Sequence, residues 1–350
     1  MPHLTFHLFG APLLQCDGAP VHIPRRRAVA CAVYLAVTGQ EISRDALTAL
    51  FWPETAPQHA RADLRRTLHL LHQALGPARL TADADRVRLQ RDADLWLDID
   101  HFRYLLAACQ GHGHSPQSVC PDCLPLLAAA VVLYRDDFLA GFALPDSPEF
   151  DRWQWFEAEN LRRDLVSALA KLVRGHTAQG EFAHAIAYAR RWVALDPLDE
   201  PAQRWLMQLY AWSGERSAAL LQHQSFAQSL AQELGAEPES ATRQLEEAIR
   251  KGRLPPPPPA AELGVLGRRD QCVTRAATAP LGEDELRVVT VLCAGLYAPD
   301  HADDLGTLVA ATERLATVTA TACAPYGGRV ERLPGGDVLA IFGADHSHED

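Results

Sequence analysis

Hydrophobic positions recur at helical spacing through much of the chain, and the clearest case is HARADLRRTLHLLHQALG, residues 59–76. Leu64, Leu68, Leu71 and Leu75 form one apolar stripe at intervals of three and four residues, the pattern of a helix that buries a single face. With about 100° between successive residues, the opposite face carries arginine, histidine and glutamine side chains. That second face is either ordinary solvated surface or a surface that lies against a negatively charged partner.

Short strands are predicted on both sides of this helix. The first 24 residues alternate and turn like strands, and Asp17-Gly18 supplies a hairpin turn. Residues 79–90, RLTADADRVRLQ, predict two further strands around an Asp-rich turn.

Two more helices are predicted between these strands. Residues 25–38 are rich in Ala, and Gly39 ends the helix that they predict. Ser43 can cap the next helix, which covers residues 44–52. With the helix in residues 59–76, the pattern is that of a winged helix-turn-helix with an N-terminal sheet.

From Asp98 to about Lys251 the pattern is helical throughout. Candidate helices cover residues 98–109, 124–138, 147–179, 181–195, 200–214 and 215–235. The last three follow the spacing of about 34 residues per helix pair that is typical of tetratricopeptide repeats. Small residues stand where these helices must approach closely, at Ala185, Ala189, Ala218 and Ala219. Tryptophans at helical spacing are expected in the core: Trp153, Trp155, Trp192, Trp205 and Trp212.

Five consecutive prolines, residues 255–259, predict a stiff linker. Beyond it, a strand, a helix over 304–327 and a hairpin over 328–343 begin a β-α-β-β unit without completing a domain. The predicted fold class is mainly α and multidomain, with an incomplete α/β fragment at the end. Its predicted parts are a winged helix (1–97), a tetratricopeptide-like helical domain (98–254), a Pro-rich linker (255–285) and a partial α/β domain (286–350).

Composition supports a globular protein with one basic region. Hydrophobic residues make up 48% of the chain, but no apolar run approaches the roughly 18–20 residues that cross a bilayer. No signal peptide is evident, so a cytoplasmic protein with reduced cysteines is expected. The net charge is −11, yet residues 1–91 hold eleven arginines against seven acidic residues. A basic region on an acidic chain is typical of a localised nucleic-acid contact.

Several stretches resemble the SARP family of bacterial transcriptional activators. LTFHLFG, RRRAVACAVYLAVTGQEISRDALTALFWPE and ARADLRRTLHLLHQALG are similar to its DNA-binding domain. LYRDDFLAGFALPDSPEFDRWQ and ELGAEPESATRQLEEAIR resemble its bacterial transcriptional activator domain. The resemblance covers residues 3–252. It implies an OmpR-like winged helix that contacts direct repeats in promoters, assembles as a homo-oligomer on DNA and helps to recruit RNA polymerase.

The helix in residues 59–76 is the third helix and precedes a basic hairpin, which is the position of a recognition helix. Such a helix needs side chains that reach base edges and arginines for phosphates. The candidate DNA-binding residues are Arg61, Arg65, Arg66, His69 and Gln73 on the helix, and Arg86 and Arg88 on the wing. By the resemblance, the loop before the helix faces RNA polymerase through Trp52, Glu54 and Thr55.

One residue departs from the expected recognition helix. Asp63 stands where a neutral polar residue is expected. Its carboxylate would repel phosphate or select a cytosine amino group. The interpretation that we favour is that Asp63 faces away from DNA and pairs with Arg66 or Thr67.

A second candidate site lies in CQGHGHSPQSVCPDC, residues 109–123. A Cys-x-x-C turn presents two thiolates, and neighbouring histidines can complete a tetrahedral zinc site. The candidate ligands are Cys109, His112, His114, Cys120 and Cys123. The alternative is a polar loop that is merely rich in thiols and imidazoles. An ion here would be structural, because the sequence places no acid–base residue beside it.

The last part of the chain resembles the start of a class III nucleotide cyclase domain, on RVVTVLCAGLYAP and GGRVERLPGGDVLAIFGADHSHED. In that family two aspartates hold the catalytic metal ions. The matching positions are Gly295 and Gly336, and Asp337 falls one step along a strand, on the other face. The resemblance therefore implies a truncated, degenerate module, and no enzyme activity is expected.

The sequence predicts a sequence-specific transcriptional activator that binds double-stranded DNA and RNA polymerase and does not contact a membrane. One alternative is a cyclase-type signalling protein with N-terminal sensor domains, which the missing aspartates oppose. The other is a tetratricopeptide-like interaction scaffold whose winged helix does not bind DNA, and Asp63 motivates that alternative.

Overall fold

The computed structural model describes residues 3–76, 78–91, 94–112, 114–115 and 117–266, together with short stretches from residue 290 onward. The chain divides into two compact units, Met1–Cys272 and Val273–Asp350. None of the helices in the described part of the chain is both long enough and apolar enough to span a membrane.

The first unit begins with a four-stranded sheet in the order β3-β2-β1-β7. Its strands are β1 (Leu4–His7), β2 (Leu13–Cys16), β3 (Ala19–Pro20) and β7 (Leu95–Leu97). β1 runs antiparallel to β2 and parallel to β7. Asp17 and Gly18 both have positive φ, as a tight turn between twisted strands requires, so the predicted hairpin is confirmed.

Three helices and a second sheet complete the winged helix. The helices are α1 (Arg26–Thr38), α2 (Arg44–Phe51) and α3 (Pro57–Leu75). Gly39 ends α1 in the left-handed conformation, and the Ser43 hydroxyl accepts a hydrogen bond from the Ala46 N–H, 3.1 Å away. The second sheet has the order β4-β6-β5. Its strands are β4 (Ile42–Ser43), β5 (Leu80–Ala82) and β6 (Arg86–Leu89), and the β5–β6 hairpin forms the predicted wing.

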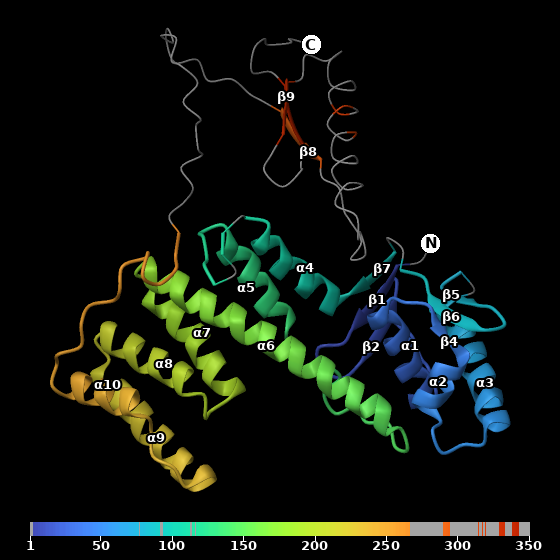
Figure 1. The fold of residues 1–350 in the computed structure, drawn as a ribbon, viewed down its shortest axis with the longest axis horizontal. Helices are drawn as coiled ribbons and strands as arrows, with labels where there is room; N and C mark the ends of the chain where they lie inside the picture. The colour runs from blue at the N-terminus through green and yellow to red at the C-terminus, as the bar shows by residue number, and fades with distance from the viewer. Residues whose placement is uncertain are drawn as a thin grey trace. The chain divides into compact units, whose positions relative to one another are not determined.

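A run of helices follows the winged helix (Figure 1). Its members are α4 (Asp98–Gln110), α5 (Cys123–Leu133), α6 (Pro148–Ala178), α7 (Phe182–Leu195), α8 (Glu200–Trp212), α9 (Arg216–Leu234) and α10 (Ser240–Arg250). α7 and α9 begin one tetratricopeptide period apart, and neighbouring helices pack against each other. Ala185, Ala189 and Ala219 are fully buried, which allows the close helix approach that the sequence predicted.

Three details differ from the sequence-based expectation. α5 ends at Leu133, not Phe138, because the chain turns there to contact the segment that follows β1: the Gly10 N–H donates to Asp137 O, 3.0 Å away. α10 was not among the predicted helices. Trp155 is exposed, and its ring packs edge-on against the ring of the exposed Phe156, so its assignment to the core was wrong.

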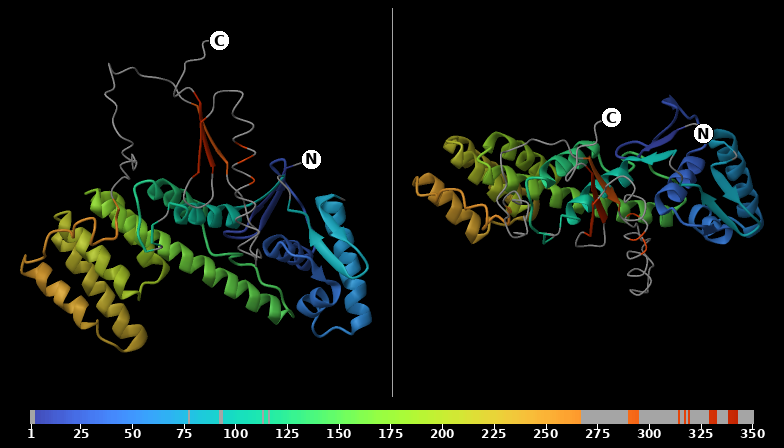
Figure 2. Two further views of the ribbon diagram at one scale, coloured as in Figure 1. Left: turned by 45° about the horizontal axis from the view of Figure 1, so that its top comes forward. Right: turned by 90° about the horizontal axis from the view of Figure 1, so that it is seen from above.

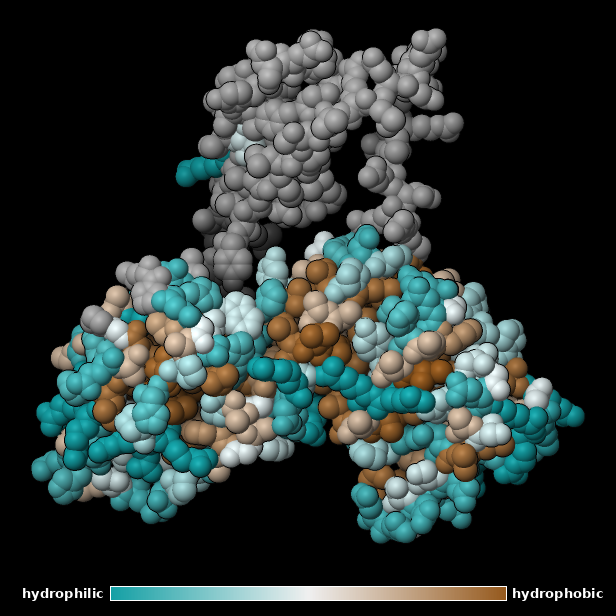
Figure 3. Space-filling model, turned by 180° about the vertical axis from the view of Figure 1, so that it is seen from behind, coloured by the Kyte–Doolittle hydropathy of each residue, from teal (hydrophilic) through white to brown (hydrophobic). Residues whose placement is uncertain are grey.

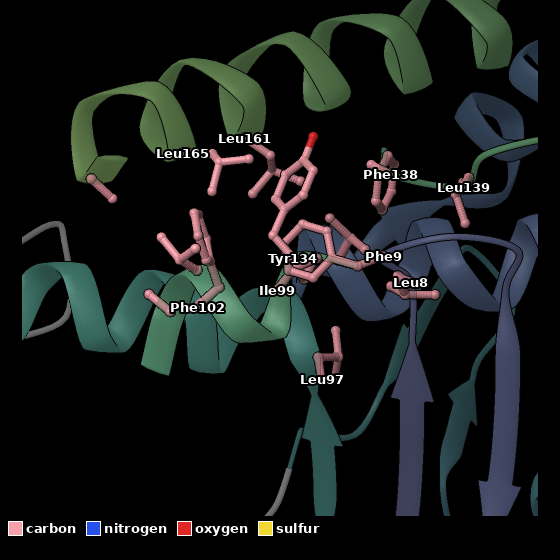
Figure 4. Packing of buried hydrophobic residues seen from close by; sticks show 14 of the residues in the cluster. Leu8, Phe9, Leu97, Ile99, Phe102, Tyr134, Phe138, Leu139, Leu161 and Leu165 are labelled. Atoms are coloured by element: carbon pink, nitrogen blue, oxygen red, sulfur yellow. The ribbon is translucent and has the colours of Figure 1, made fainter. Parts of the chain in front are cut away.

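The winged helix and the helices after it share one hydrophobic core. Figure 4 shows the Phe9 ring beside Tyr134, with Phe102 of α4 and Leu161 of α6 in the same cluster. The buried Asp98 carboxylate accepts hydrogen bonds from the N–H groups of Leu8 and Phe9 at 2.8–3.0 Å. Burial raises the pKa of Asp98, and these N–H groups oppose that rise.

The long helix α6 connects the helical array to the winged helix (Figure 2). Near its start, the Ser147 hydroxyl donates to Phe51 O at 3.1 Å. The rings of Phe51 and Phe150 lie 5.5 Å apart, and those of Tyr34 and Trp153 lie 4.9 Å apart. These contacts join α6 to both α1 and α2.

The second unit contains a three-stranded antiparallel sheet in the order β8-β10-β9. Its strands are β8 (Thr290–Ala294), β9 (Arg329–Arg332) and β10 (Val338–Phe342). The strand and the hairpin lie where the sequence predicted them. The positions compared with the cyclase aspartates, Gly295, Gly336 and Asp337, lie outside the described residues.

Candidate nucleic-acid interface

Helix α3 is anchored by its leucine stripe. Leu64, Leu68, Leu71 and Leu75 are all buried, as predicted, and Thr67 is buried between them. The helix starts at Pro57. Proline lacks an N–H, but the N–H groups of the first turn have no acceptor within the helix, so no hydrogen bond is lost there. The backbone of α3 is therefore fixed against the domain, and its opposite face has a defined orientation.

The opposite face carries the five predicted recognition residues, and all of them are exposed: Arg61, Arg65, Arg66, His69 and Gln73. The side chains of His69 and Gln73 lie 3.0 Å apart, within hydrogen-bonding distance. Arg65 makes no ion pair with any described residue. Its guanidinium is available to a phosphate or a guanine without giving up an intramolecular partner.

Two arginines of this face are paired within the chain. Arg66 and Asp63 form an ion pair at 2.8 Å, which confirms the pairing that we favoured for Asp63. Arg61 pairs with Asp45 of α2 at 3.0 Å. Both pairs are largely exposed, where ion pairs contribute little to stability and exchange readily. These arginines can therefore change partner when a polyanion approaches.

The wing is held by its Asp-rich turn. The Asp83 carboxylate accepts hydrogen bonds from the N–H groups of Asp85 and Arg86, at 2.8 and 2.6 Å. These bonds, aided by the nearby Arg44 and Arg86 guanidinium groups, lower the pKa of Asp83. Arg88 is exposed on the wing strand β6, so the turn presents cationic side chains from a defined hairpin.

A hollow of about 850 Å³ joins these elements. It is lined by the N-terminus of α2, the first half of α3 and the wing, including Arg44, Arg61, Arg65 and Arg86. The structure therefore brings together residues of the recognition helix and the wing that the sequence assigned to one site. Arg86 also pairs with Glu41 at 3.5 Å.

Arg25 is an additional residue of this surface that the sequence-based interpretation did not assign. It lines a smaller hollow with Arg65, Arg66 and His69. Its neighbours in the RRR run have other roles: the Arg26 guanidinium lies over the Phe142 ring, and Arg27 donates to Pro145 O at 3.2 Å. The three-arginine run was the available signal, but only the fold separates its members.

The loop between α2 and α3 shows a mixed arrangement. Trp52 is buried, with the Arg27 guanidinium 5.5 Å from its ring centre. Glu54 is exposed and Thr55 is half-buried. Trp52 therefore anchors the loop to the domain, and Glu54 and Thr55 are the predicted residues that a partner can reach.

In Figure 3, hydrophilic residues line much of the outer edge of the winged helix.

The predicted metal ligands separate into a group of four and one outlier. One ligand atom each from His112, His114, Cys120 and Cys123 lies within 4.8 Å of all the others. Cys109 is buried outside this group, where its thiol lies 3.5 Å from Leu105 O. Burial raises the pKa of the Cys123 thiol to about 12.

Comparison with known proteins identifies relatives of this chain. Residues 97–250 match the family of the bacterial transcriptional activator domain. The transcriptional regulatory protein MoaR1 of Mycobacterium tuberculosis is 27% identical over 254 residues, which cover 70% of this chain and 79% of MoaR1. The regulatory protein AfsR of Streptomyces coelicolor is 26% identical over 70% of this chain, but the match spans only 24% of AfsR.

A solved structure has the same fold. The structure of Mycobacterium tuberculosis EmbR in complex with a low-affinity phosphopeptide aligns with a TM-score of 0.57 at 23% identity, over 75% of this chain and 68% of that chain. The transcriptional regulatory protein EmbR of M. tuberculosis is 27% identical in sequence over 253 residues, 63% of its length. MoaR1 and EmbR are transcriptional regulatory proteins, and AfsR is a regulatory protein.

Proposed function

We propose that this chain, a SARP-type transcriptional regulator that carries a bacterial transcriptional activator domain, binds promoter DNA through α3 and the wing. The observation that carries the proposal is the exposed polar and cationic face of α3, held in place by the buried leucine stripe behind it. Arg61 and Arg65 of this face line the same hollow as Arg86 of the wing. An α-helix fits the major groove, and a neighbouring hairpin can reach the adjacent backbone or minor groove.

The side chains of this surface suggest different roles in binding. Arg65 has no intramolecular ion pair to exchange among the described residues and is suited to a guanine or a phosphate. His69 and Gln73 can bond base edges. Arg61, Arg66, Arg86 and Arg88 supply positive charge for phosphates.

The division of labour along the chain is part of the proposal. Residues 1–97 bind DNA, and residues 98–254 mediate dimerisation or signal reception, so that two copies occupy repeated promoter sites. RNA polymerase would meet the loop after α2 through Glu54 and Thr55, because these residues are accessible and Trp52 is not. A regulator that binds bacterial promoters works in the cytoplasm, where the DNA lies.

The His/Cys group fits this function as a structural zinc site. Four protein ligands fill a tetrahedral coordination sphere and leave no open position for a substrate or a water molecule. His112, His114, Cys120 and Cys123 offer the nitrogen and sulfur donors that zinc prefers.

A pull-down of genomic DNA fragments by the full chain tests DNA binding. The parent protein is expected to enrich a shared repeat motif, and Arg65→Ala/Arg66→Ala is expected to lose it. Arg243→Ala is a matched control, because it removes an exposed arginine from α10, at the far end of the chain's first unit in sequence. If the parent enriches no motif at low salt, the scaffold alternative replaces this proposal.

A further inference from the structure

We propose that a zinc ion bound by His112, His114, Cys120 and Cys123 clamps the segment through which the chain leaves the helical array. This inference rests on the structural zinc site proposed above and adds that the bound ion holds this segment in place. The loop between α4 and α5 carries three of the ligands, and Cys123 at the start of α5 is the fourth. The same loop pairs with residues 264–266, just beyond the proline run.

The four ligand atoms are spaced for one tetrahedral ion. His112 Nδ1 lies 3.3 Å from Cys120 Sγ and 3.2 Å from Cys123 Sγ. His114 Nε2 lies 3.1 Å from Cys123 Sγ, and the two sulfurs are 3.5 Å apart. Zinc bonds of about 2.0–2.3 Å in tetrahedral geometry place ligand atoms roughly 3.3–3.8 Å from one another. The four printed distances are close to these values, and all ligand atoms lie within 4.8 Å of one another, so small side-chain adjustments would accommodate the ion.

Local structure positions the ligands before any ion binds. Cys120 and Cys123 are joined by a tight turn in which the Cys123 N–H donates to Cys120 O at 3.0 Å. Cys123 is also the first residue of α5, while the histidines follow the end of α4 at Gln110. An ion held by both pairs thus ties the end of one helix to the start of the next.

The donor set favours zinc over other cations. Both sulfurs are buried, and buried thiolates need a cation to offset their loss of hydration. Thiolate and imidazole select zinc in preference to magnesium or calcium, which take oxygen ligands. Cys109 is not part of the set, because its thiol lies against the carbonyl oxygens of Leu105 and Cys123.

The loop that carries the ligands also holds the exit segment. The Val119 N–H donates to Gly264 O, and the Leu266 N–H donates to Val119 O, both at 2.9 Å. Val119 directly precedes the ligand Cys120. Gly264 has φ +67°, a conformation that favours glycine, and it lets the chain turn into this pairing.

A second attachment lies upstream and does not depend on the loop. The Trp212 indole N–H donates to Pro255 O at 2.9 Å, so the proline run starts from α8. Leu263 and Val265, near the end of the docked segment, are buried within the first unit. Fixing Val119 through its neighbour Cys120 therefore determines where the docked segment ends, whereas Trp212 determines where it begins.

Metal content and hydrogen exchange on the full chain test this proposal. Elemental analysis should find one zinc per parent chain and none in Cys120→Ser/Cys123→Ser. Cys109→Ser and His184→Ala are matched controls and should keep the ion. His184 belongs to a separate group of possible metal ligands among the described residues, His176, Glu181 and His184. Circular dichroism of each variant reports whether the helices still form.

Zinc removal from the parent by a chelator should speed exchange of the Val119 and Leu266 amides at least tenfold, and added zinc should restore it. The Arg253 amide, bonded to Ala248 O at the end of α10, should keep its rate. Absence of zinc from the zinc-supplied parent would overturn both the site and the clamp. Bound zinc with unchanged Leu266 exchange would overturn the clamp alone, and neither result depends on DNA binding.

Discussion

At the residue scale, Asp63 controls how much positive charge α3 presents. Its carboxylate pairs with Arg66 at 2.8 Å, so the pair offers DNA less charge than Arg66 alone would. Asp63→Asn should strengthen binding to non-specific duplex and steepen the salt dependence by up to about one phosphate contact. Fluorescence anisotropy over a salt series measures this. Glu247→Gln, which breaks a similar exposed pair on α10, should leave the slope unchanged.

The buried Asp98 illustrates a residue whose role is structural. Asp98→Ala would leave the N–H groups of Leu8 and Phe9 without an acceptor, at a cost of about 2–4 kcal/mol in the free energy of unfolding. Urea denaturation followed by circular dichroism measures the loss. Asp100→Ala is the matched control: its carboxylate pairs with Arg91 at the surface, so the change should stay below about 1 kcal/mol. Equal losses in the two variants would contradict this role.

At the scale of elements, the two faces of α3 should separate stability from binding. Leu68→Ala opens a cavity behind the helix and should lower the free energy of unfolding by about 2–5 kcal/mol. Arg65→Ala removes an exposed side chain and should leave stability within about 0.5 kcal/mol while weakening DNA binding. Paired urea titrations and anisotropy measurements check this. A large loss of stability in Arg65→Ala would mean that the arginine supports the fold and not DNA.

The sequence predicted elements well where a local signal marks them. The leucine stripe, the Ser43 cap and the Gly39 stop depend on neighbouring residues, and each is confirmed. The end of α5 depends on a distant partner: beyond the helix, Asp137 O accepts from the Gly10 N–H, and the Leu139 N–H donates to Leu8 O. No periodicity near Tyr134 encodes that contact. Trp155 fits the helical spacing of the other tryptophans, yet its ring is exposed, because spacing alone does not say which side of α6 other helices cover.

The candidate sites show the same limit. Residue type and spacing identified the basic helix and the His/Cys loop. They could not show that Arg25 lines the same hollow as Arg65, because residues 25 and 65 meet only through packing of α1 on α3. Likewise, Cys109 has the right chemistry for a zinc ligand, but its place inside the last turn of α4 directs the thiol to backbone carbonyls.

At the scale of the whole molecule, α6 makes the winged helix and the array one structural unit. Phe150 and Trp153 near its start pack on rings of α2 and α1, and residues farther along it are buried among α5 and α7. Two domains that share a core in this way should unfold together, so a change in the array should be felt in the winged helix. Under the proposed function, that coupling would let a signal received by the helical domain reach the surface of α3 that is proposed to bind DNA.

The coupling can be tested with a cavity in the helical array, outside the winged helix. Leu169 is fully buried in the second half of α6, and Leu169→Ala should lower the free energy of unfolding by about 2–5 kcal/mol. If the unit is cooperative, native-state hydrogen exchange should show the same loss of protection for amides of α1 as for amides of α7. Arg163→Ala, an exposed change on the same helix, should alter neither. Protection lost in α7 but retained in α1 would show that the winged helix unfolds independently, and α6 would then be a connector without the ability to transmit a change.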